Sequence, residues 1–257
     1  EPMRSKPPLV PAALFLFALA VVPARAQAQN LAEMWQITPK AGVEVGFQEA
    51  FKAHMDFRVA HGETWIWQTW EIVVGEDVGD FLIVSFDHSW ADWDAYEVGD
   101  FMQVAGAHFG ATVSPLVEDA ANMIFQGDST LSKMPTDPAY EPSLVNTMAF
   151  SLAPGKFMAF NGAMAQLHAA IVEADMPFFY LSSAPVVGGD DSDFTMAFIG
   201  ESWADFTDPD PDLMQVMAEK YGEEEAMAIW TTLDESVAGI QSSMLRLRPD
   251  LSNLPEI

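Results

Sequence analysis

Three ionisable side chains recur at helical spacing in the stretch FKAHMDFRVAHGETWIW, residues 51–67. His54, Arg58 and His61 follow Phe47 and Phe51 in steps of three and four residues, so all five side chains share one face of a predicted helix. A helix directs such a face at the core. Burying an unpaired guanidinium costs several kcal/mol, so these groups need polar partners, water or a ligand.

A second copy of this segment makes the contrast clear. At an offset of 113 residues the five positions are apolar, namely Phe160, Met164, Leu167, Ile171 and Ala174. The second copy therefore has an ordinary core stripe, and the first has ionisable groups where its counterpart is hydrocarbon. This difference predicts a polar-lined pocket in the first copy, between the helix and the sheet beneath it.

Each residue of this pocket has an expected role. Arg58 would hold a small organic anion, and His54 and His61 would donate hydrogen bonds or act as general base near neutral pH. Trp65 and Trp67 alternate along the next predicted strand and would form one wall, whereas Trp70 points to the other face. The sequence thus predicts a small-molecule-binding protein or a cofactor-independent enzyme, with the second copy serving a structural role.

Two alternatives remain open. In a structural or interaction protein the three side chains would pair with acids such as Asp56 or Glu63, or reach solvent at the helix end. In a haem-dependent oxidative enzyme a histidine would be the axial ligand, but no motif selects one. No cofactor is predicted, and no metal site either, because His54 and His61 lie two turns apart with a cation between them.

The other histidines carry weaker signals. His88 precedes a helix cap and corresponds to Glu201, which predicts an exposed position. His108 corresponds to Lys220 and is expected near the surface. His168 is expected to face away from the apolar stripe of its own helix.

The duplication extends well beyond this helix. From Gly42 to Trp93, 14 of 52 positions are identical to those 113 residues later, including Val73-Val74-Gly75 and the run Ser89-Trp90-Ala91-Asp92. At a slightly different offset, residues 131–135 (LSKMP) match residues 251–255 (LSNLP). We divide the chain into a first repeat at 31–126, a linker at 127–144 and a second repeat at 145–257.

Each repeat is predicted to have the order β-α-β-β-α-β. The expected strands are 32–38, 64–74, 81–87 and 118–126, then 145–152, 177–187, 194–200 and 236–248; the first helices span 43–61 and 156–174. In both copies Ser-Trp-Ala-Asp predicts a capping box at a helix start. The predicted fold class is α+β, with two tandem ferredoxin-like units packed sheet to sheet as one intrachain barrel.

This element order, together with the segments SFDHSWADWDAYE and IGESWADF, resembles the dimeric α+β barrel superfamily. That superfamily includes antibiotic-biosynthesis monooxygenases, EthD-like and NIPSNAP-like proteins and, more distantly, chlorite dismutases. The resemblance covers nearly all of the chain after residue 30 and implies a fold. It implies no single reaction, because one fold supports many chemistries.

Composition predicts where the protein works. Residues 1–26 resemble a secretory signal, with Arg4 and Lys6 before an apolar run and cleavage expected before Gln27 or, as the alternative, after Ala28. The chain has no cysteine and a formal net charge of −27. Such a charge disfavours nucleic acid and anionic membranes as partners. We expect a bacterial periplasmic or secreted protein with a small-molecule ligand and no membrane span after signal removal; the sequence predicts no oligomeric state.

Overall fold

The computed structural model describes residues 30–188 and 193–255. The predicted signal peptide lies outside these residues. The first half contains β1 (Leu31–Pro39), α1 (Glu44–Ala60), β2 (Gln68–Val74), β3 (Phe81–His88), α2 (Trp90–Tyr96), α3 (Phe101–Thr112), a short 3₁₀ helix η1 (Ser114–Leu116) and β4 (Val117–Gly127). The second half contains β5 (Leu144–Leu152), α4 (Phe157–Glu173), β6 (Phe179–Gly188), β7 (Phe194–Gly200), η2 (Trp203–Phe206), α5 (Leu213–Tyr221), α6 (Glu223–Ser236), β8 (Val237–Leu247) and η3 (Pro249–Leu251).

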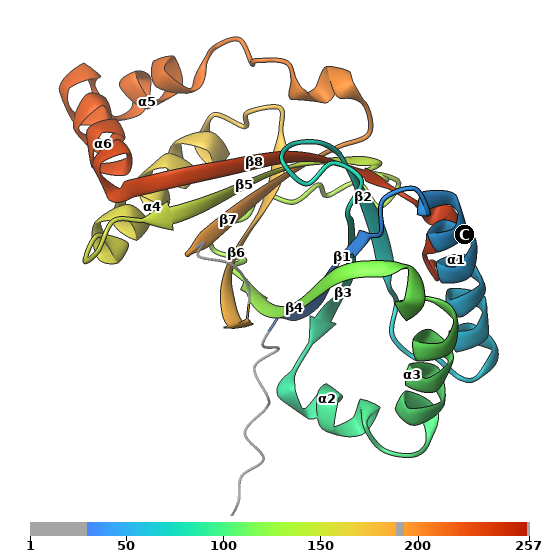
Figure 1. The fold of residues 1–257 in the computed structure, drawn as a ribbon. Helices are drawn as coiled ribbons and strands as arrows, with labels where there is room; N and C mark the ends of the chain where they lie inside the picture. The colour runs from blue at the N-terminus through green and yellow to red at the C-terminus, as the bar shows by residue number, and fades with distance from the viewer. Residues whose placement is uncertain (1–29, 189–192, 256–257) are drawn as a thin grey trace, which may run out of the picture.

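The eight strands form one closed antiparallel barrel in the order β1-β3-β2-β8-β5-β7-β6-β4. Within each half the order is the same: the last strand pairs with the first, the first with the third, and the third with the second. The halves meet at two seams, β2 with β8 and β4 with β6. Helices α1–α3 and α4–α6 lie on opposite sides of the strands (Figure 1). The chain has a mixed, ferredoxin-like α+β fold.

One glycine at each seam explains why Val-Val-Gly occurs twice. Gly75 has φ +133° and a Cβ there would lie 2.5 Å from Ser243 Oγ on β8. Gly188 has φ +71° and a Cβ there would lie 2.5 Å from the Asn122 carbonyl oxygen on β4. Both positions need a residue that adopts positive φ and has no side chain, so glycine allows the strands to approach.

Three groups of buried side chains hold the barrel together. One lies between α4–α6 and the second-half strands and includes Phe160, Leu167 and Ile171. The second lies between α1–α3 and the first-half strands and includes Phe47, Phe51 and Trp67. The third lies inside the barrel, around Trp70, Val145 and Leu245. Because strand side chains alternate between faces, each sheet has an outer face under helices and an inner face toward the other sheet.

The sequence placed most elements within two residues of their observed ends, with one exception. The strand predicted at 64–74 begins only at Gln68. Trp65 and Trp67 instead bond to the C-terminal segment: Asn253 Oδ1 accepts from the Trp67 N–H, and Asn253 Nδ2 donates to the Trp65 carbonyl. The side chain of Asn253 therefore takes the place of a strand partner.

The segment predicted as a linker, 127–144, also makes specific contacts. Leu131 is buried in the second-half core, and Lys133 pairs with Tyr180 through two backbone hydrogen bonds. Ser132 Oγ accepts from the Ser182 N–H at 2.9 Å. The C-terminal segment repeats this arrangement on the first half, where Ser252 Oγ accepts from the Thr69 N–H at 2.8 Å. Each segment binds the second strand of one half.

Candidate functional site

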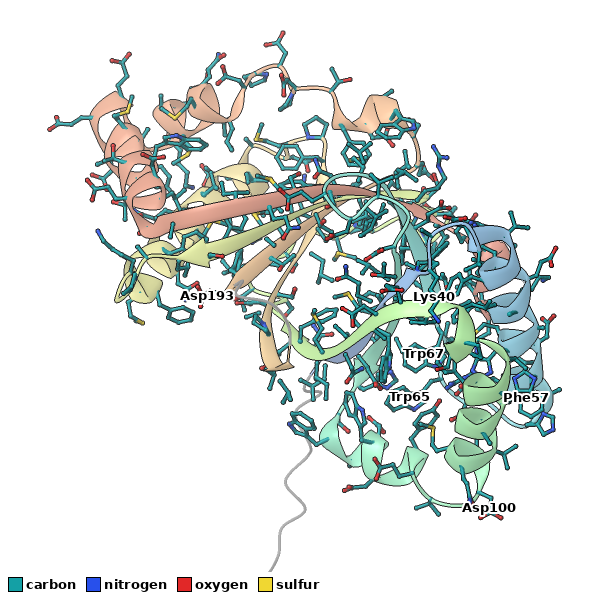
Figure 2. The ribbon with its side chains drawn as sticks, in the orientation of Figure 1. Lys40, Phe57, Trp65, Trp67, Asp100 and Asp193 are labelled. Atoms are coloured by element: carbon teal, nitrogen blue, oxygen red, sulfur yellow. The ribbon has the colours of Figure 1, made fainter. Side chains whose placement is uncertain are left out.

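A cavity of about 260 Å³ lies on the outer face of the first-half sheet. Helices α1 and α3 cover it, and Trp65 and Trp67 lie between this sheet and helices α2 and α3 (Figure 2). Most of its wall is apolar. The lining residues are Glu33, Trp35, Ile37, Phe51, His54, Met55, Arg58, Trp67, Ile83, Tyr96, Met102, Ala105, Gly106, Phe109 and Ala120.

The cavity has an opening on one side. Trp35 on β1 and Met102 on α3 belong to its wall, yet each is 40 % exposed. The residues at the opposite end, including Phe51 and His54, are buried. A small molecule could therefore enter between the side chains of Trp35 and Met102 and reach the buried end of the cavity.

His54 lies at that buried end, where the sequence placed it. Its Nδ1 is 3.1 Å from His108 Nδ1, so one of the two rings must donate a proton to the other. Burial is the main cause that lowers the pKa of His54 to about 4, and the charge of Arg58 adds to it. The imidazole is therefore neutral at physiological pH and can donate or accept a hydrogen bond.

Arg58 also lines the cavity, but its charge is already balanced. Its Nε donates to Glu63 Oε2 at 2.7 Å, and the Glu63 side chain is fully buried. The Tyr96 hydroxyl receives a hydrogen bond from Arg58 and donates to Glu63. Burial raises the pKa of Tyr96 well above its usual value, so the phenol keeps its proton. The sequence predicts that Arg58 clamps an anion, and in the structure it pairs with Glu63, the carboxylate that the structural alternative names.

Trp67 supplies the one buried side-chain polar atom without a hydrogen-bond partner in the described part of the chain. This atom is the indole Nε1 of a residue that lines the cavity. The indole lies near enough to the Tyr96 hydroxyl to lower the pKa of that group, but the pair does not meet hydrogen-bond geometry. An unsatisfied buried donor costs about 1–3 kcal/mol, so the site would gain from a ligand oxygen placed here.

The other two predicted residues lie outside the cavity wall. Trp65 is buried between His88 and Tyr96, with ring centroids 3.6 and 4.1 Å away, and so supports the wall from behind. His61 follows the last residue of α1, is exposed, and donates from its Nδ1 to the Phe57 carbonyl. Of the five predicted residues, the cavity therefore brings together His54, Arg58 and Trp67.

The remaining histidines correct the sequence reading in part. His88 is buried, not exposed: its Nε2 lies 2.7 Å from Ser85 Oγ and its ring stacks on Trp65. His108 is half-buried and contacts His54 across two helices. His168 is half-buried too, with its Nδ1 2.8 Å from the Tyr180 hydroxyl. The contacts of His108 with His54 and of His168 with Tyr180 each join two different elements of the fold, so the spacing of residues along one helix cannot reveal them.

Sequence reasoning missed Tyr96, Glu33 and the α3 side of the cavity. Tyr96 was visible as the last aromatic residue of the capped segment SWADWDAY, and on α3 Phe101, Ala105 and Phe109 recur at every fourth position. That spacing predicts a face directed at the core. Glu33 gives no comparable signal, because its carboxylate is held by Trp35 Nε1, Trp93 Nε1 and Asn122 Nδ2 from three different elements.

The residues present do not fit a haem group. Drug-sized ligands need pockets of roughly 300–1,000 Å³, and a porphyrin is at least as large. The cavity beside His54 is smaller, at about 260 Å³. A larger cavity inside the barrel has no histidine in its wall. Within residues 30–188 and 193–255, no three histidine or acidic side chains are grouped as a metal site would require.

Comparisons with known proteins place the fold but give no family. No family profile and no curated relative matches the chain. A candidate monooxygenase from Lactobacillus acidophilus NCFM superposes with a TM-score of 0.53 at 8% identity, covering 87% of this chain and 95% of the other. An anthrone oxidase-like protein gives 0.52 at 14% identity, covering 86% and 92%. A variant chlorite dismutase from Candidatus Nitrospira defluvii gives 0.51 at 11% identity, with 86% and 92% covered.

These likenesses show the fold. At such low identity they carry no residue roles from one protein to another. The neighbours agree with the predicted α+β fold. In the parts of the chain that the structure describes, every helix is too short or too polar to traverse a bilayer.

Proposed function

We propose that this protein binds a compact, uncharged organic molecule in the cavity between α1, α3 and the first-half sheet. The observation that carries the proposal is the Trp67 indole N–H, a buried donor without a partner on a residue that lines a mostly apolar cavity. Pockets of this kind combine apolar walls with a few convergent polar groups. Here those groups are Trp67, His54 and Tyr96.

The charges around the cavity favour a neutral ligand over the organic anion suggested by the sequence. Arg58 is paired with the buried Glu63, which lies behind the wall, and Glu33 adds a carboxylate to the wall itself. The local formal charge is therefore not positive. An anion would also have to approach a chain whose net charge is −27. A carbonyl or ether oxygen can accept from Trp67 without these costs.

Cofactor-independent chemistry at the same cavity is the second candidate, and the His54–His108 pair favours it. A neutral imidazole at the buried end of a cavity can accept a proton from a bound substrate, and the second ring can relay it. In this proposal His54 touches the substrate, Arg58 holds Tyr96 in place, and Trp65 supports the wall. His61 has no part, since it lies outside the cavity.

The rival proposal is a structural protein in which this network has no ligand. It is supported by the mutual hydrogen bonds of Arg58, Glu63 and Tyr96, which satisfy one another without outside help. It leaves Trp67 Nε1 unexplained. Ligand binding therefore separates the two proposals.

We further infer that the two halves descend from one duplicated ferredoxin-like unit. The equal strand order in both halves supports this, as do the equivalent glycines at the seams. The strongest support is the reciprocal binding of residues 131–133 to β6 and of residues 251–253 to β2. Export to a bacterial periplasm or the exterior stays part of the proposal, because it depends on residues 1–26.

The experiment compares two small molecules of equal size, acetophenone and benzoate. Melting temperatures are measured across millimolar concentrations of each, because a ligand of the native state raises the temperature of unfolding. We expect acetophenone to raise it and benzoate to have at most a small effect. Trp67→Phe removes one hydrogen bond, worth about 1 kcal/mol, and should weaken acetophenone binding about fivefold.

Trp203→Phe is the matched control. Trp203 lies on η2, is 50% exposed and lines neither cavity, so its replacement should leave acetophenone binding unchanged. Binding of neither compound, or equal loss in both tryptophan variants, would favour the structural rival.

A further inference from the structure

A second and larger cavity, of about 730 Å³, lies inside the barrel. Its wall comes from strands of both halves, whereas the cavity beside His54 belongs to the first half alone. The two cavities are on opposite faces of the first-half sheet: Trp67 lines the outer one and Trp70 the inner one. The inner cavity is therefore a separate feature that the proposed function does not use.

Small side chains at inward positions leave this space open. On β5 the inward residues are Val145, Thr147 and Ala149, and the register places Thr147 beside Ala197 of β7 and Ser243 of β8. An eight-stranded barrel is just wide enough for its side chains to fill it. Here alanine, serine and threonine occupy the middle of three neighbouring strands, so the interior has room for a ligand.

The charges of the wall select the kind of ligand. No lysine, arginine or histidine is among its lining residues, and its two acids are Asp77 and Asp87. Asp87 is exposed, and Asp77 is half-buried. An anionic ligand such as a fatty acid would meet these carboxylates with no cation to balance it. Because the rest of the wall is mostly apolar, an uncharged molecule pays the smallest desolvation cost.

Several polar groups of the wall are available to such a molecule. The Gln68 amide and the hydroxyls of Ser183 and Thr195 line the cavity, and no side-chain hydrogen bond joins them to the residues that the structure describes. They come from strands of both halves. A ligand with one or two hydroxyl or carbonyl oxygens could be bonded from both sides of the barrel.

We propose that the barrel interior is a second binding site, for an uncharged lipophilic molecule of drug size with one or two hydrogen-bonding oxygens or nitrogens. Its volume lies in the upper part of the range for ligand pockets, roughly 300–1,000 Å³. Both halves contribute to it, so a bound molecule should also strengthen the contact between them.

The test uses two dyes with one aromatic framework, the neutral N-phenyl-1-naphthylamine and the anionic 8-anilino-1-naphthalenesulfonate. Fluorescence titrations with the full chain give both dissociation constants. We expect the neutral dye to bind in the micromolar range and the anionic dye at least tenfold more weakly. Absence of neutral-dye binding, or equal affinity for the anionic dye, would overturn the proposal.

Substitutions inside the barrel test whether the dye binds there. Ala197→Phe fills the middle of the cavity and should weaken neutral-dye binding at least tenfold. Ala149→Leu adds a smaller side chain on the neighbouring strand and replaces Ala197→Phe if that variant does not fold. It should weaken neutral-dye binding at least threefold. Met102→Trp is the control at the mouth of the other cavity and should have no effect. A dye that is displaced by Met102→Trp and unaffected by Ala149→Leu would contradict a site in the barrel.

Discussion

The α1 and α4 helices pack on equivalent strands and differ in polarity at three positions of one face. In the second half Leu167, Ile171 and Ala174 continue the apolar stripe, and the first two are buried in a hydrocarbon core. In the first half His54 and Arg58 take the equivalent buried positions and are joined to His108 and Glu63.

The comparison shows what a polar replacement requires. Arg58 corresponds to Ile171, and its partner Glu63 corresponds to Met176, so both members of the ion pair stand where the second half has apolar residues. His61, which corresponds to Ala174, is exposed and needed no partner within the core. Ionisable groups thus persist in the core only where a second polar group accompanies them.

Removal of one partner should give the largest effect. In Glu63→Gln the Arg58 guanidinium loses its only carboxylate among the described contacts, and we expect a loss of about 3–5 kcal/mol in the free energy of unfolding. The measurement is urea unfolding at pH 7. The control is Asp175→Asn, which breaks the ion pair between Asp175 and Lys133. The Asp175 side chain is 91% exposed, so the loss of this pair should cost under about 1 kcal/mol.

The second half supplies the compensating change. The double variant Arg58→Ile with Glu63→Met copies the residues of the equivalent positions, Ile171 and Met176. We expect it to recover about 2 kcal/mol relative to Glu63→Gln, because an apolar pair leaves no buried charge, although the Tyr96 hydroxyl and the Trp65 N–H lose their acceptor. A double variant as unstable as Glu63→Gln would mean that the ion pair itself stabilises the fold.

Acid should destabilise the first half through His54. Its pKa is about 4 in the folded protein and about 6.5 unfolded, so the unfolded chain binds more protons between these values. The stability contribution is complete above pH 6.5 and is lost as the pH falls toward 4, by about 2–3 kcal/mol in total. His54→Leu, which copies Leu167, should remove this part of the pH dependence. Unfolding curves at pH 7, 5.5 and 4 check it; parallel curves for both proteins would contradict the assigned burial.

The two helix caps should respond alike, with the smallest effect. Asp92 accepts from the Ser89 N–H at 2.6 Å, and Asp205 accepts from the Ser202 N–H at 3.0 Å. Replacing either serine by alanine removes a hydroxyl bonded to the same carboxylate and should cost about 1 kcal/mol. Unfolding measurements on Ser89→Ala and Ser202→Ala should agree within about 0.5 kcal/mol. A large difference would show that the caps are not equivalent.

Features repeated in both halves were readable from the sequence, because local pattern sets them. The strand and helix ranges follow from periodicity, and the Ser-Trp-Ala-Asp runs form the predicted capping boxes. The unusual residue at position 58 was also evident from the sequence, because Arg58 is a cation and its counterpart Ile171 belongs to an apolar stripe. A cavity lies next to Arg58, and whether it binds a ligand stays a prediction.

Features that depend on distant contacts were not readable. His88 is buried because it stacks on Trp65, and the start of β2 is delayed because Asn253, 186 residues from Trp67, bonds to its backbone. The balance of charge around Arg58 also had to come from the structure, because the sequence offered both Asp56 and Glu63 as partners. The barrel cavity arises from small residues on three strands, which no single strand reveals.

The most direct measurement follows the indole N–H signal of Trp67 in ¹H–¹⁵N spectra during titration with acetophenone, with the signal assigned by Trp67→Phe. The account predicts that this signal moves downfield and saturates, while the indole signal of Trp203, which lines neither cavity, stays in place. A Trp67 signal that does not move at saturating acetophenone, or that moves together with every other tryptophan, would contradict a ligand site beside α1.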